Sequence, residues 1–179
     1  MNLNLNKSDF IDLNKVTGET LTSVTIGLGW DVRKGFFGGS IDLDASCVMF
    51  AGETITDTVW FRQLKSRDGS VKHTGDNVTG AGDGDDEQII VNLDQLPSNV
   101  TKLVFTVNSY TGDNFNRVQN AYCRIVDNKR GNEIARFNIS DAGPHTGMIM
   151  ASLTRSDDIW TFTAIGKTGY GRTYHELLA

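Results

Sequence analysis

The chain has 179 residues, of which 39% are hydrophobic and 22% are charged, and its mean hydropathy is −0.28. A soluble chain of this size buries an adequate core without disulfide bonds, so we expect a single domain spanning residues 1–179. With 17 Lys and Arg against 22 Asp and Glu, the net charge is −5, which argues against nucleic acid as the main partner.

The N-terminal stretch MNLNLNKSDF lacks the apolar segment of a secretory signal, and no later run approaches the ~18 apolar residues of a spanning helix. Cys47 and Cys123 lie in apolar, strand-like segments, which favours two reduced core cysteines over a disulfide or a metal pair. We therefore expect a cytoplasmic protein with no transmembrane segment, for which membrane association is possible only peripherally.

Apolar residues at every second position dominate the chain, beginning with 24–30 and 41–49. This alternation, with its β-branched and aromatic residues, predicts half-buried strands. Further strands are expected at 58–64, 88–93, 102–108, 121–126, 133–139, 148–153 and 159–165. The pattern predicts an all-β fold, an antiparallel β-sandwich of two sheets, with a closed barrel as the alternative.

Helical patterns are few, and only one or two short helices are expected. A short helical turn is predicted within 114–120, capped by Asp113 or Asn114, and another within 173–179. Trp30, Trp60 and Trp160 lie on alternating segments and are expected in the core.

Two aspartates share one face of the predicted strand at 41–49. Residues two apart in a strand point the same way, so Leu43 and Ala45 would face the core while Asp42 and Asp44 face away from it. Two residues apart along a strand, the carboxylates are about 6.6 Å from each other. In bulk water two charges at this distance repel by only ~0.6 kcal/mol, which a solvated strand face tolerates. The pair alone is therefore compatible with an ordinary exposed surface.

A second acidic segment, TGDNVTGAGDGDDEQ at 74–88, carries five carboxylates and neither Lys nor Arg. Oxygen-rich, glycine-rich loops suit Ca²⁺, which accepts six to eight oxygen ligands including backbone carbonyls. Zinc fits poorly because the three histidines are scattered, and we expect His73 to be partly exposed with a local hydrogen bond. A solubilising acidic turn is the alternative interpretation.

Motifs of catalysis are missing from the sequence. It contains no Gly-x-Ser-x-Gly elbow, P-loop or His-Glu-x-x-His motif, and Gly27-x-Gly29 lacks the third glycine of a dinucleotide fingerprint. We therefore expect a protein that is not an enzyme. A hydrolase that uses a metal-activated water is the catalytic alternative.

Several stretches together resemble the TerD family of tellurium-resistance and general stress-response proteins. They are GLGWD at 27–31, DLDAS at 42–46, the whole of 65–87, NFNRVQNAY at 114–122 and IARF at 134–137. The resemblance covers nearly the whole chain. It implies a β-sandwich that binds two Ca²⁺ ions side by side at one end.

The resemblance also implies a ligand set and a function. The ligands would be Asp31, Asp42, Asp44, Asp76, Asn77, Asp83, Asp85, Asp86 and Glu87, with backbone carbonyls from Gly80 and Gly84. The function would be that of a calcium-binding stress-response protein, a non-enzymatic binding or signalling module with protein partners in a stress-response complex. The alternative is a calcium-dependent adhesion or surface-recognition module.

Overall fold

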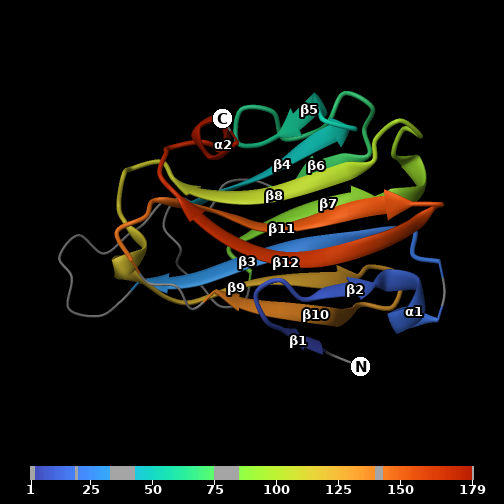
Figure 1. The fold of residues 1–179 in the computed structure, drawn as a ribbon, viewed down its shortest axis with the longest axis horizontal. Coiled ribbons are helices and arrows are strands. Elements are labelled where there is room, and N and C mark those ends of the chain that lie inside the picture. The colour runs from blue at the N-terminus through green and yellow to red at the C-terminus, as the bar shows by residue number, and fades with distance from the viewer. Residues whose placement is uncertain (1–2, 19, 33–42, 75–84, 140–142, 179) are drawn as a thin grey trace.

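The computed structural model describes residues 3–18, 20–32, 43–74, 85–139 and 143–178, and places their strands in two six-stranded sheets (Figure 1). Sheet A has the strand order β1 (Leu3–Leu5), β10 (Asn132–Ile139), β9 (Val118–Asp127), β3 (Ser23–Val32), β7 (Glu87–Asn92) and β6 (Val71–His73). Sheet B has the order β2 (Phe10–Asp12), β12 (Ile159–Gly169), β11 (Gly147–Ser156), β8 (Lys102–Ser109), β4 (Leu43–Ala51) and β5 (Thr54–Val59).

All strand pairs are antiparallel except β1 with β10, which is parallel. Each sheet ends in its own edge strands, so the described strands form a sandwich and the barrel alternative is wrong. The strands run along the long axis in Figure 1, and β3, β8 and β12 all end on its left side. These three strands therefore finish at the same end of the sandwich.

One hydrophobic cluster fills the space between the sheets. Alternate residues of β3, from Val24 to Trp30, contribute to it from sheet A, and Leu43, Ala45 and Cys47 contribute from sheet B. Cys47 and Cys123 are both buried free thiols, as expected from their apolar segments. The core face of the strand beginning at Leu43 was therefore predicted correctly.

Short helices occupy the ends and connections. Helix α1 (Leu13–Thr17), which was not predicted, begins where the Asp12 side chain accepts from two backbone N–H groups. The expected turn near residue 115 is a 3₁₀ helix, η2 (Phe115–Arg117), capped by Asn114, and a second one, η1, spans Leu93–Gln95. Helix α2 (Tyr174–Leu177) begins with a capping box at Thr173.

The predicted strand at 58–64 is wrong in its bounds. Strand β5 ends at Val59, and Trp60 then forms a tight turn by exchanging two backbone hydrogen bonds with Gln63. Trp30 and Trp160 are core residues as predicted, but Trp60 is half-buried and packs on the rings of Tyr174 and His175. Among the described residues, no helix has the length and apolar character needed to cross a membrane.

Replacing Phe105 by Ala should destabilise the fold by about 3–5 kcal/mol, because its ring is fully buried between the sheets and truncation leaves a cavity. Phe10→Ala is the matched control, since that ring is 71% exposed and its loss should cost less than about 0.5 kcal/mol. Urea unfolding monitored by tryptophan fluorescence measures both values. Equal midpoint shifts for the two variants would contradict the assigned core.

Candidate metal centre

Three strand ends that carry acidic residues meet at one end of the sandwich, together with the strand end that carries Asn120. Strand β3 ends just after Asp31, β4 begins just before Asp44, and β7 begins at Glu87. Strand β9 reaches the same place, because Asn120 donates a 3.0 Å hydrogen bond to the Asp31 carboxylate. This is the left end in Figure 1, where the arrow of β3 terminates.

Glu87 links the two sheets at this end. It is only 1% exposed, and its Oε2 accepts a 2.5 Å hydrogen bond from the backbone N–H of Ala45, on β4 of sheet B. The same oxygen lies 3.3 Å from Nε2 of His73, which is also 1% exposed. His73 is therefore a buried partner of Glu87, and the expectation of a partly exposed histidine was wrong.

Asp86 extends the pairing between β3 and β7 beyond the last strand residue. Its backbone N–H donates to the carbonyl of Leu28 at 2.8 Å, and its Oδ2 accepts from the N–H of Trp30 at 2.7 Å. Burial raises the pKa of Asp86, the Trp30 hydrogen bond lowers it, and the charges of Asp31 and Asp85 raise it further. The net shift is upward, and burial of the carboxylate is its main cause.

Asp85 has very different surroundings. Arg124 donates to both of its carboxylate oxygens, at 2.8 and 2.7 Å, and Tyr122 and Gln88 donate one hydrogen bond each. Burial alone would raise the pKa of Asp85, but these hydrogen bonds and the guanidinium charge bring it below the ordinary carboxyl value. Asp85 is thus a carboxylate stabilised in its ionised form.

Asp44 points to the side of β4 opposite the core residues Leu43 and Ala45, as its position in the strand predicts. It is nevertheless buried, with 5% exposure, beside its cross-strand neighbour Asn108 on β8. The Asn108 side chain donates to the carbonyl of Gly171, so the chain leading to α2 lies over this face of sheet B. The expected solvated strand face is therefore covered at Asp44.

The structure brings together the strand ends that carry Asp31, Asp44, Asp85, Asp86 and Glu87. The other predicted ligands lie outside the described residues: Asp42, Asp76, Asn77, Gly80, Asp83 and Gly84. Within the ranges that the structure describes, no three side chains of His, Cys, Asp or Glu form a group that could hold a metal ion. The described carboxylates therefore amount to part of a ligand set.

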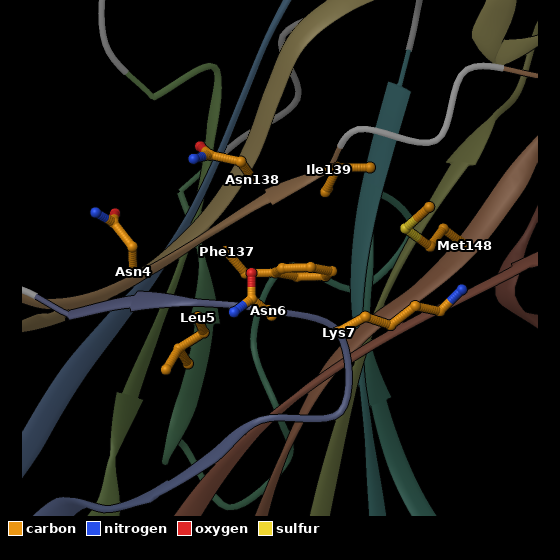
Figure 2. Close-up of a pocket in the computed structure, with 8 residues that line it drawn as sticks. All are labelled: Asn4, Leu5, Asn6, Lys7, Phe137, Asn138, Ile139 and Met148. Carbon is orange, nitrogen blue, oxygen red and sulfur yellow. The ribbon is translucent and has the colours of Figure 1, made fainter.

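A separate polar groove of about 480 Å³ lies between β1, β10 and β11. Figure 2 shows the amide side chains of Asn4, Asn6 and Asn138 around it, with Lys7 and Met148 also contributing to the lining. Among the described residues that line it, there is a Lys and no carboxylate, which offers no ligand set for a divalent cation.

The sequence analysis missed His73, Tyr122 and Arg124 as parts of this region. Strand alternation could have placed Tyr122 and Arg124 on one face of β9, but their pairing with Asp85 joins residues 37 and 39 positions apart. The Gly27-x-Gly29 motif was the available signal, because Gly27 lies against the Asp85 carboxylate and Gly29 lies against the Tyr122 ring.

A sandwich of two six-stranded sheets with acidic strand ends gathered at one end defines the class of protein. The protein-family model for the TerD domain matches residues 1–179 of the sequence. The chain therefore belongs to the TerD family.

Named relatives agree with this assignment. The tellurium resistance protein TerZ of Serratia marcescens is 49% identical, covering 98% of this chain and 94% of its own length. The stress response protein SCP2 of Bacillus subtilis (strain 168) is 42% identical, and the alignment covers 93% of this chain and 92% of the SCP2 chain. A crystal structure of a homologue of the telluride resistance protein TerD from Streptomyces coelicolor A3(2) has a TM-score of 0.74 at 20% identity, covering 89% of this chain and 98% of its own. At that identity the crystal structure supports the fold alone.

The neighbours Asp85 and Asp86 should respond oppositely to neutralisation in metal-free protein. A raised pKa means that Asp86 contributes stability below the ordinary carboxyl pKa, which is lost as the pH rises. Asp86→Asn should therefore raise the unfolding free energy at pH 7, by less than about 1 kcal/mol because solvent screens this carboxylate. The gain should disappear towards pH 4.

The lowered pKa of Asp85 has the opposite effect on stability. Its ionised carboxylate stabilises the fold above the ordinary carboxyl pKa, and this contribution is lost as the pH falls through the lowered pKa. Asp85→Asn should cost about 2 kcal/mol at pH 7, because it breaks charge-assisted hydrogen bonds. Urea unfolding of both variants in chelator, at pH 7 and at pH 4, measures the sign of each change in unfolding free energy relative to the parent. Shifts of the same sign at pH 7 would contradict the assigned environments.

Proposed function

We propose that this TerD-family chain is a calcium-binding, non-enzymatic stress-response module, with Ca²⁺ bound at the acidic end of the sandwich. The observation that carries the proposal is the bridge from Glu87 on sheet A to Ala45 on sheet B. This bridge brings the start of β4, which carries Asp44, next to the start of β7, which follows the acidic segment. Carboxylates from distant parts of the chain therefore converge on one end.

The chemistry of the described donors fits a hard cation. Asp31 and Asp86 supply carboxylate oxygens, and the pKa of Asp86 is raised in part by its acidic neighbours. Bound Ca²⁺ would neutralise that repulsion. Calcium suits such a set better than Zn²⁺, which takes Cys and His, or Mg²⁺, which retains more water. Asp31, Asp44, Asp86 and Glu87 are the described candidates, and two ions remain our expectation.

The proposed role is a surface that partner proteins recognise when the ion is bound. Relatives named for tellurium resistance and for stress response support a role in stress protection. Cys47 and Cys123 are free thiols buried in different sheets, which is in keeping with a reducing compartment, and we propose the cytoplasm.

A calcium-dependent surface-recognition module is the second candidate function, and exposed tyrosines favour it. Tyr110 follows the end of β8 and is 39% exposed, and Tyr170 follows the end of β12 and is 66% exposed. Both flank the acidic end, where a bound cation could bring them to an anionic surface. Sedimentation with phosphatidylserine vesicles should then require Ca²⁺ and weaken in Tyr170→Ser. Equal amounts of pelleted protein in calcium and in chelator would exclude this candidate.

Calcium should stabilise the folded protein. A ligand that binds only the folded form adds about 2.7 kcal/mol at a hundredfold excess over its Kd. We expect the melting temperature to rise on adding Ca²⁺ to chelator-treated protein and to respond much less to Mg²⁺. Calorimetric titration should give about tenfold or greater loss of affinity for Asp31→Asn and for Asp86→Asn.

Glu53→Gln is the matched control. It removes one carboxylate from the turn between β4 and β5, at the opposite end of β4 from Asp44. Its calcium affinity should equal that of the parent. Superimposable melting curves in chelator and in millimolar calcium would refute the proposed function.

A further inference from the structure

The Asp85 carboxylate lies on the outer face of sheet A, against Gly27 of β3. We propose that Asp85 is an anchor for the chain just before β7, and that Tyr122 and Arg124 are positioning residues for Asp86, a proposed calcium ligand. Asp85 would then be removed from the ligand set. This inference rests on the proposed function for its effect on affinity, but the anchor itself does not require calcium.

Four hydrogen bonds occupy both oxygens of Asp85. Oδ1 accepts from Arg124 Nε at 2.8 Å and from the Tyr122 hydroxyl at 2.9 Å. Oδ2 accepts from Arg124 Nη2 at 2.7 Å and from Gln88 Nε2 at 2.9 Å. The side chain is 1% exposed. A cation at this carboxylate would have to displace these donors beside a guanidinium charge, so ligation by Asp85 is disfavoured.

The positions of Tyr122 and Arg124 are themselves fixed by neighbouring side chains. Arg124 lies 3.6 Å from the carboxylate of Glu133, which also pairs with Arg136 at 2.9 Å. The Arg136 guanidinium stacks over the Tyr122 ring, 4.1 Å from its centroid. The donors to Asp85 are therefore held in place by a network on β9 and β10.

Gly27 and Gly29 make room for the anchor. A Cβ atom on Gly27 would lie 2.4 Å from Oδ2 of Asp85, and one on Gly29 would lie 2.4 Å from the Tyr122 ring. Neither position allows any side chain while Asp85 and Tyr122 stay where they are. The glycine pair of the GLGWD stretch is explained by this close approach rather than by a special backbone conformation.

The anchor fixes the residue that follows it. Asp85 is held on the outer face of sheet A, whereas Glu87 is held between the sheets by Ala45 and His73. Asp86 lies between these two fixed points and points its carboxylate at Trp30. Releasing Asp85 should therefore loosen Asp86, a proposed calcium ligand.

For Arg124→Gln, an effect of charge alone and the loss of the Asp85 anchor predict opposite changes in calcium affinity. Removing a positive charge near an acidic site should tighten calcium binding if electrostatics alone matter. The anchor instead predicts about tenfold weaker binding with unchanged stoichiometry. Gly27→Ala leaves every charge in place and should weaken binding to a similar extent, because its Cβ expels the Asp85 carboxylate.

Asp85→Asn separates an anchor from a ligand. An anchor predicts the same loss of affinity as Arg124→Gln, no further loss in the double variant, and the parental stoichiometry. A lost calcium equivalent, or additive effects in the double variant, would overturn the proposal. Lys72→Gln is the matched control, since it removes one charge from the exposed face of β6 in the same sheet and should leave affinity at or above the parental value.

Hydrogen exchange tests the anchor without calcium. In chelator, Arg124→Gln and Gly27→Ala should speed exchange at the amides of Trp30 and Asp86 about tenfold or more, while Val104 in sheet B keeps its parental rate. Unchanged exchange at Trp30 and Asp86 in folded variants would refute the anchor. If these amides respond but the parent shows no calcium binding, the proposed function fails and the anchor stands.

Discussion

The acidic end of this protein depends on one buried carboxylate between the two sheets. Burying an ionised carboxylate costs several kcal/mol unless hydrogen bonds replace its water. Oε2 of Glu87 accepts from the Ala45 N–H and lies 3.3 Å from Nε2 of His73, and each of these partners is supplied by a different strand. Because Ala45 belongs to β4 and His73 belongs to β6, these two contacts fix the position of the start of β7 relative to both strands.

Three consecutive acidic residues consequently face three different environments. Asp85 lies against Gly27 and Arg124 on the outer face of sheet A, Asp86 lies beside β3, and Glu87 lies in the interior. The pKa of the first is lowered and that of the second is raised, although they are neighbours in the chain. A run of acidic residues is therefore not a uniform negative patch. Under the proposed function, structural anchoring and cation binding would be divided among its members.

Much of the fold followed from the alternation of apolar residues, because one buried face per strand leaves a period of two in the sequence. Strands such as β7 and β10 were predicted to within a residue or so for this reason. The error at 58–64 arose because Trp60 continues the apolar pattern while the chain turns back through Gln63. Helix α1 was missed because a single turn buries only Leu13 and shows no helical period.

By itself the sequence determined the sandwich, the family resemblance and the acidic character of two segments, since these rest on local pattern and residue type. It could not determine which carboxylates are buried, paired or crowded. Those properties depend on partners such as Arg124 and Ala45, which lie 39 and 42 positions from the acidic residues they contact. Only the tertiary structure brings such distant groups within hydrogen-bonding distance, and a carboxylate's charge state and role are set at that range.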